Sequence, residues 1–252
     1  MRTLSNSWTM TKRCLLVSLR NPDGLAITIM VPAMVMALFV LIFGGIADVG
    51  DYSYIDFIVP GIILQTAGQA VAAVAINVNN DMRKGMNDRF RSMQISKSSV
   101  LTGHVMASLV RNIISTTIVI GVAFILGFRP TAGFVDWLVI SGIIVLYMLM
   151  ITWISVIAGV VSKSPESASG GIFLLFILPY VSSGFTPLEA LPSWLRGFAE
   201  HQPMTPIIDS LRGTMLGLPV ETRTLTLAIV WCVAITVVSF LIATQIYNRK
   251  IS

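Results

Sequence analysis

The sequence predicts an all-α membrane protein with six transmembrane helices. Hydrophobic residues make up 55% of its 252 residues and charged residues only 12%, and the mean hydropathy is +0.82. A soluble domain carries about a quarter charged residues, so the deficit indicates a surface that faces lipid rather than water. The apolar residues also gather in six runs, each near the roughly 20 residues that a helix needs to cross the hydrocarbon core. These runs span about residues 25–46, 55–78, 105–127, 134–161, 169–185 and 225–247.

Lysine and arginine are distributed unequally between the two sides of the predicted spans. Twelve fall on the side that holds both termini and the connection between the second and third spans, whereas four fall on the opposite side. Cytoplasmic connections carry the excess of basic residues in membrane proteins, so both termini should lie in the cytoplasm. Because the net charge of +5 sits in the gaps between apolar runs, a membrane surface explains it better than nucleic acid does.

Residues 3–21, before the first span, are predicted to form an amphipathic helix. Trp8, Leu15 and Leu19 share one side of such a helix, and the basic residues lie elsewhere. That pattern is typical of a helix lying in the cytoplasmic membrane interface. The alternative is an ordinary basic leader held by anionic lipid. The segment is a poor signal peptide, because its apolar run is short and is broken by Arg20.

The second predicted span carries a stripe of polar residues. At 100° per residue they occupy one third of the helix circumference. Side-chain amides in lipid are costly unless they are paired, so this face should look into the bundle or a cavity. The alternative is that the stripe only bonds neighbouring helices together. Its members are Gln65, Thr66, Gln69, Asn77 and Asn80.

The connection after the second span, residues 80–96, holds six of the few charges in this chain. Gly85 separates an extension of the span from a short segment, residues 86–95. In that segment Arg89, Phe90 and Met93 can form a compact helix with apolar and basic faces. The positive-inside rule explains the basic residues but not the apolar ones.

The fifth run and the connection after it depart from simple spans. The fifth run is the shortest, opens with Gly170–Gly171 and contains Pro179. Residues 186–223 are too apolar for a solvated loop and too interrupted for a span. A capping box at Thr186 and a second cap at Thr205, each followed by Pro, predict two short helices joined around residues 201–203. We expect them to be re-entrant from the outer side; a lid of surface helices is the alternative.

No catalytic or metal-binding constellation occurs in the chain. Its two histidines, His104 and His201, fall on opposite sides of the membrane, and the sequence contains no phosphate-binding loop of the Walker type. Asp56 and Asp136 stand at span ends, where carboxylates are usually solvated. Arg111, about two turns into the third span, is expected to reach back to the cytoplasmic side. The chain is therefore predicted to be no enzyme, with no metal or cofactor of its own.

Three stretches of the sequence resemble one known family. They are NDRFRSMQIS at residues 87–96, SKSPESASG at 162–170 and FTPLEALPSWLRGFAEHQPMTPIIDSLRG at 185–213. In these stretches the chain resembles the permease subunit of type-2 ATP-binding-cassette transporters, and most of all the daunorubicin-resistance-type drug-efflux permeases. The family often has Pro where this chain has Gln94, a departure that affects only local helix geometry. The resemblance extends over essentially the whole chain.

The resemblance implies a fold, partners and functional residues. Residues 1–252 would form one permease domain without a nucleotide-binding domain. It would pair with a second permease, identical or paralogous, and with two copies of a cytoplasmic ATPase that binds ATP and Mg. The connection between spans two and three would be the coupling helix that docks on the ATPase, through Arg89, Phe90, Arg91 and Met93. The translocation path would run beside spans two and five, lined by Gln65, Gln69, Phe173, Phe176 and Tyr180.

The function implied is export of an amphiphilic drug or lipid-like compound across the cytoplasmic membrane of a prokaryote. Alternatives within transport are export of a polysaccharide, a peptide antibiotic or ions by a similar permease. A membrane scaffold or receptor without transport is the alternative from another class. An ion-coupled carrier is disfavoured, because it usually shows an ionisable residue deep in a span.

Overall fold

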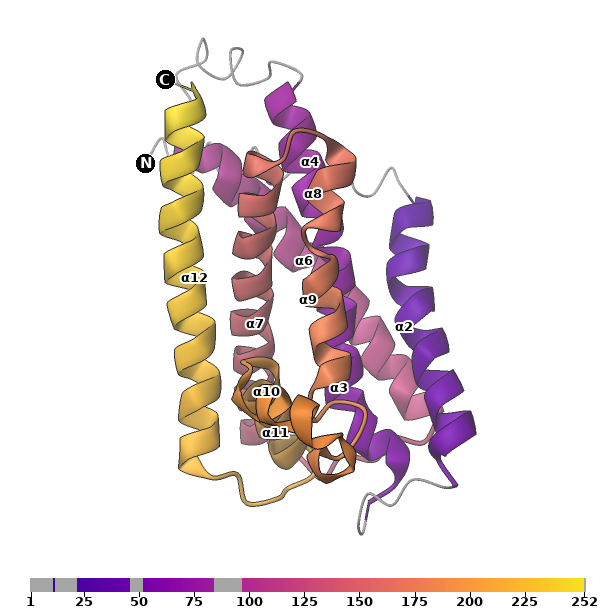
Figure 1. The fold of residues 1–252 in the computed structure, drawn as a ribbon. Coiled ribbons are helices and arrows are strands. Elements are labelled where there is room, and N and C mark those ends of the chain that lie inside the picture. The colour runs from indigo at the N-terminus through magenta and orange to yellow at the C-terminus, as the bar shows by residue number, and fades with distance from the viewer. Residues whose placement is uncertain (1–10, 12–21, 46–51, 84–96, 252) are drawn as a thin grey trace.

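The computed structural model describes residues 22–45, 52–83 and 97–251 together with Thr11, and these form a bundle of helices without a strand (Figure 1). Within these ranges five helical stretches are long and apolar enough to cross a membrane. The all-helical membrane fold expected from the composition is therefore confirmed. The five are α2 (Pro22–Phe43), α3 with α4 (Tyr54–Ala70 and Ala72–Arg83), α6 (Lys97–Ile125), α7 (Phe134–Val161) and α12 (Thr222–Ile251).

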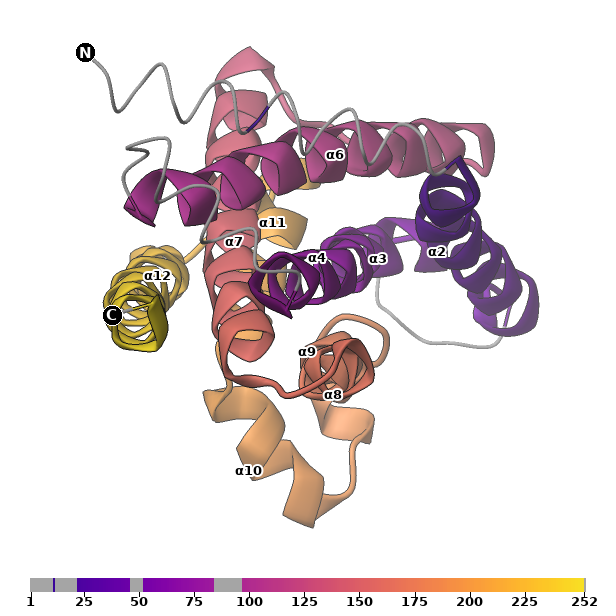
Figure 2. The same cartoon turned by 90° about the horizontal axis from the view of Figure 1, so that it is seen from above.

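The second span lies deep in the bundle. Figure 2 shows α7 between α12 and the α3–α4 span, with α6 on one side of that span and α8 and α9 on the other. The helix α2 stands at the margin, where it packs on α3 and α6. α3 and α4 are separated at Val71, which interrupts the helix near its middle. The polar stripe of this span is therefore divided between two helices.

Helix caps explain where two of these spans begin. Ser53 precedes α3, its side chain accepts from the backbone N–H of Asp56, and its hydroxyl donates to the Asp56 carboxylate at 2.5 Å. At the start of α7 the backbone N–H of Gly133 donates to Asp136 at 2.8 Å. Asp56 and Asp136 are thus not simply solvated, because each carboxylate satisfies backbone or cap groups at a helix N-terminus.

The fifth predicted span is a chain of short helices instead of one continuous helix. It consists of α8 (Pro165–Gly170), α9 (Phe173–Ile177) and the 3₁₀ turn η1 (Leu178–Val181). Ser164 caps α8 by accepting from the N–H of Ser167. The residues predicted to interrupt the span, the glycine pair and Pro179, lie at the α8–α9 junction and in η1. The apolar helical stretch Pro165–Val181 is shorter than the five spans.

The connection before α12 contains the two short helices predicted around residues 201–203. These are α10 (Ser193–His201) and α11 (Met204–Met215), preceded by the 3₁₀ turn η2 (Leu188–Ala190). Both predicted caps are wrong. Pro187 and Pro203 occupy the N-cap positions, and neither η2 nor α11 has a side-chain cap bond. Thr205 lies inside α11, where its hydroxyl donates to the carbonyl of Ala199 at 2.5 Å.

The two ends of the bundle differ in chemistry. At one end, called the basic end below, α4 finishes at Arg83 and α12 finishes with Arg249 and Lys250 (Figure 1). The ammonium of Lys250 donates to the Val160 carbonyl at 2.7 Å, which ties α12 to the last turn of α7. The other end, the α11 end, holds α10, α11 and the beginnings of α3, α7 and α12. The predicted interfacial helix at residues 3–21, apart from Thr11, lies outside the described residues.

Candidate functional site

All five predicted path residues lie along one contact, between α3 and the broken fifth segment. Gln65 and Gln69 belong to α3, Phe173 and Phe176 to α9, and Tyr180 to η1. Gln65 is fully buried, and its side-chain amide donates to the Tyr180 hydroxyl. The sequence could single these residues out because amides and aromatic rings are conspicuous in apolar runs. Their role in transport stays a prediction.

The aromatic residues of this contact continue into an aromatic ladder that reaches the α11 end. Ring centroids are 6.3 Å apart for Phe173–Phe176 and 5.8 Å for Phe176–Tyr180. Tyr180 stacks on Phe185 at 4.5 Å, and Phe185 meets Phe39 edge-on at 5.2 Å. Such pairs stabilise beyond the area that they bury. Phe185 and Phe39 were missed by the sequence analysis, because nothing in their local pattern distinguishes them from other lipid-facing phenylalanines.

A cavity of about 230 Å³, called the inner cavity below, opens beside this ladder. It is lined by Gly68, Gln69, Ala72, Ser169, Ile172, Phe173 and Phe176, and none of these described lining residues is charged. Gly68 lies in this wall, and a Cβ added there would stand 3.4 Å from the Leu175 carbonyl oxygen, at ordinary van der Waals distance. The buried Oε1 atoms of Gln65 and Gln69 have no hydrogen-bond partner within the described residues. The site therefore offers aromatic surface and unpaired amide acceptors.

Other polar side chains of this span bond within their own helix or to the end of α7. The hydroxyl of Thr66 donates to the Ile62 carbonyl of its own helix at 2.7 Å. Asn79, which the stripe did not include, is buried, and its amide donates to the carbonyls of Gly159 at 3.1 Å and Ser162 at 2.7 Å. Whether the stripe lines a path or only bonds helices together stays a prediction. Its α3 half faces the fifth segment, and an asparagine of α4 holds α7.

The break between α3 and α4 is stabilised by side chains of two neighbouring spans. The guanidinium of Arg111 donates to the Ala70 carbonyl at 2.7 Å, and the hydroxyl of Ser155 donates to the Val71 carbonyl at 2.5 Å. The Ala70 carbonyl lies at the C-terminal end of α3, where carbonyls lack intrahelical partners and the helix dipole favours a cation. The Val71 carbonyl also accepts from the backbone N–H of Val74 at 2.9 Å. The expectation that Arg111 reaches back to the cytoplasmic side is wrong. α6 begins at Lys97, so Arg111 lies about four turns inside it.

Arg212 holds α11 against the start of the second span. Its guanidinium donates to the carbonyls of Phe57, at 3.1 Å, and Ser183, and lies 3.9 Å from the centre of the Phe57 ring. It also pairs with Asp209 at 2.9 Å, and Asp209 accepts from the Ser183 hydroxyl at 2.6 Å. Burial lowers the pKa of Arg212 to about 10, so it stays cationic at neutral pH. The sequence analysis counted Arg212 only as an outer charge.

At the basic end, an ion pair links the second and third spans. The Nε2 atom of His104 lies 3.1 Å from an Asp81 carboxylate oxygen, and both side chains are largely buried. Asp81 belongs to α4, which continues to Arg83 as expected for the extension of the second span before Gly85. The predicted coupling residues Arg89, Phe90, Arg91 and Met93 lie outside the described residues, in the segment 84–96 that joins α4 to α6 at this end.

Comparison with known proteins assigns the family. The family described as ABC-2 type transporter matches residues 5–216, which is most of the chain. The chain belongs to this family. The earlier resemblance to type-2 ATP-binding-cassette permeases is therefore confirmed. This ABC-2 type chain is a multi-pass permease of the prokaryotic cytoplasmic membrane.

Relatives of this ABC-2 type chain include permeases of drug-resistance systems. It is 25% identical over 216 residues to the daunorubicin resistance ABC transporter permease protein DrrB1 of Streptomyces coeruleorubidus, covering 85% of this chain and 75% of the relative. It is 26% identical over 215 residues to the probable doxorubicin resistance ABC transporter permease protein DrrC of Mycobacterium tuberculosis, covering 83% and 76%. The inner membrane transport permease YadH of Escherichia coli is 24% identical over 199 residues, or 76% of each chain.

Proposed function

We propose that this chain is the permease subunit of an exporter that moves an amphiphilic drug or lipid-like compound out of the cell. The inner cavity is the observation that carries the proposal. Its described lining combines aromatic rings with an unpaired buried amide acceptor and has no charge. Such a lining suits a ligand that is largely apolar and carries a few hydrogen-bond donors. The names of DrrB1 and DrrC, which refer to resistance to amphiphilic drugs, support the same substrate class.

The proposed topology has six crossings with both termini in the cytoplasm. A helix of 17 residues is about 25 Å long, whereas the hydrocarbon core is about 30 Å thick. The fifth segment, Pro165–Val181, is therefore slightly too short to cross alone. α10 and α11 would complete its outer side as re-entrant helices. The burial of Ile207, Ile208 and Leu211 on α11 supports this placement.

The energy for transport would come from a separate subunit. Two copies of a cytoplasmic ATPase would bind ATP and Mg and dock on residues 86–95 of two permeases, identical or paralogous. Closure of the ATPases would draw the two docking segments together and move the permease halves as rigid bodies. Arg89, Phe90, Arg91 and Met93 would form the contact. The position of residues 84–96, between two helices that meet at the basic end, supports this role.

The proposal is tested by reversing charge in the docking segment. We expect the double variant Arg89→Glu/Arg91→Glu to lose co-purification of the ATPase and to lower ATP-dependent efflux of a fluorescent amphiphile about tenfold or more, because two attractive contacts become repulsive. The matched control is Lys163→Glu/Arg249→Glu, a double reversal at the same end but outside the segment. Unchanged ATPase binding and efflux in the first variant would refute the coupling role. A scaffold without transport would bind the ATPase yet show no ATP-dependent efflux in the unmodified protein.

A further inference from the structure

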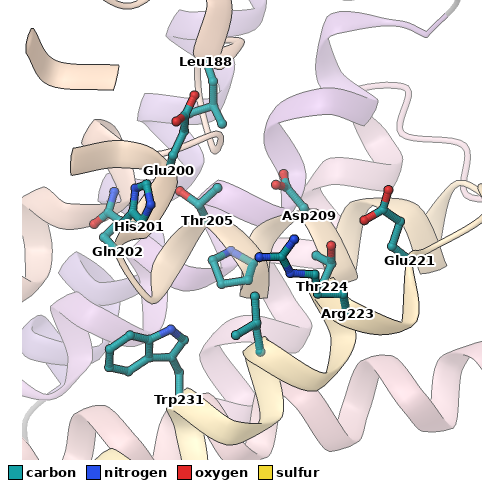
Figure 3. A pocket seen from close by; sticks show the side chains of 12 residues that line it. Leu188, Glu200, His201, Gln202, Thr205, Asp209, Glu221, Arg223, Thr224 and Trp231 are labelled. Atoms are coloured by element: carbon teal, nitrogen blue, oxygen red, sulfur yellow. The ribbon is translucent and has the colours of Figure 1, made fainter. Parts of the chain in front are cut away.

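A larger cavity of about 520 Å³ opens at the α11 end, between α10, α11 and the first turns of α12 (Figure 3). We call it the outer cavity. It shares no described lining residue with the inner cavity. Figure 3 shows Asp209 and Glu221 on one side, Glu200 and His201 on the other, and Trp231 below them. These residues come from α10, α11 and α12, which follow one another in the chain, and from Glu221 just before α12.

One carboxylate in the lining of the outer cavity is available to a cation. Its described lining contains the carboxylates of Glu200, Asp209 and Glu221 and the single guanidinium of Arg223. Asp209 is paired with Arg212. Glu200 is paired with Arg196, but both side chains are well exposed, and such surface pairs are weak. Glu221 makes no ion pair within the described residues, so its carboxylate is the one open to a ligand cation, although the partners Arg196 and Arg212 together with Arg223 balance the three carboxylates.

The other walls of the outer cavity suit an apolar body with a hydrogen-bond donor. Trp231 is 39% exposed and Leu227 is 41% exposed, so each presents apolar surface at the cavity. Gln202 is only 4% exposed, and its amide donates to the Val181 carbonyl. Its Oε1 atom has no partner within the described residues, although Gln202 lines the cavity. A buried acceptor without a donor is costly, and a ligand N–H would satisfy it.

We propose that the outer cavity binds an amphiphile carrying a protonated amine. The ammonium group, with three N–H donors, lies among Glu200, Asp209 and Glu221, and the apolar part lies against Trp231 and Leu227. Two sources could supply this chemistry: a cationic compound exported through the protein, or a lipid with a primary-amine headgroup in the outer leaflet. The proposal goes beyond the proposed function and does not depend on it, because binding requires neither ATP nor an ATPase.

The test is equilibrium binding to the full-length protein in phosphatidylcholine nanodiscs. Radiolabelled dodecylamine is the probe, and dodecanol, with the same chain and no charge, is its matched comparison. We expect saturable binding of dodecylamine above the partitioning into lipid, and none of dodecanol. The double variant Glu200→Gln/Glu221→Gln should bind dodecylamine about tenfold more weakly, since two partly exposed charge contacts are lost. These two carboxylates leave the Asp209–Arg212 pair intact, so folding is preserved; an unchanged melting temperature checks this.

The control variant is Glu189→Gln, which removes an exposed carboxylate on η2 outside the cavity lining. It should bind dodecylamine as the unmodified protein does. Saturable binding of dodecanol with equal affinity, or undiminished dodecylamine binding in the double variant, would overturn the proposal.

Phosphatidylethanolamine added to the nanodisc distinguishes the two possible sources of the ligand. If phosphatidylethanolamine competes with dodecylamine, the site is assigned to lipid. If it does not compete, the site is assigned to the exported compound. The docking variant Arg89→Glu/Arg91→Glu should still bind dodecylamine like the unmodified protein, even if it no longer exports.

Discussion

The inner and outer cavities differ most in charge. The described lining of the inner cavity holds no ionisable group, whereas that of the outer cavity holds three carboxylates and one guanidinium. The difference follows from depth. A charge surrounded by membrane spans is costly, and one at the end of the bundle can reach water. Selection at the inner cavity must therefore rest on shape and amide contacts, and selection at the outer cavity can rest on charge.

The largest expected effect comes from Arg212, which holds α11 against the start of the second span. Arg212→Met keeps the volume but removes the bonds to Phe57, Ser183 and Asp209. The carbonyls of Phe57 and Ser183 lose this donor, and a buried acceptor left without one costs about 1–3 kcal/mol, whereas the 36% exposed Asp209 can turn to water. We expect a large fall in melting temperature, measured in detergent, or no folded protein. Arg196→Met removes an exposed pair on α10 and should hardly change the melting temperature. Equal melting of the two variants would mean that Arg212 does not hold α11 in place.

The next largest effect is expected from Gly68→Leu, which should lower transport without changing ligand binding at the outer cavity. Gly68→Leu puts a large side chain into the inner cavity, where an added Cβ already lies 3.4 Å from the Leu175 carbonyl oxygen. We expect ATP-dependent efflux to fall about tenfold through loss of space and overpacking. Dodecylamine binding to the outer cavity should stay unchanged. Gly142→Leu is the matched control, because a Cβ there meets nothing within 4 Å. Normal efflux in Gly68→Leu would exclude the inner cavity from the path.

The features that the sequence predicted correctly are those with local signals. Apolar runs predicted the five long helices, and isolated amides such as Gln65 stood out within them. The features that it missed depend on distant partners. Arg212 reaches a carbonyl 155 positions away in the chain, and no spacing rule connects it to Phe57. The two predicted caps are wrong because a Pro stands at each N-cap position, and the Thr205 hydroxyl instead bonds to the Ala199 carbonyl of the neighbouring helix α10.

The smallest expected effect is on the affinity of the outer cavity for dodecylamine, and it comes from Trp231. Trp231→Phe keeps an apolar ring in the outer cavity but weakens its attraction for a cation, since indole is the best of the aromatic faces. We expect dodecylamine affinity to fall about twofold. Trp194→Phe is the matched control, because Trp194 is 78% exposed and does not line the cavity. A loss in Trp231→Phe as large as that in the double carboxylate variant would mean that the ring, and not the charge, selects the ligand. The two cavities would then differ in ligand selection through their size and not through their charge.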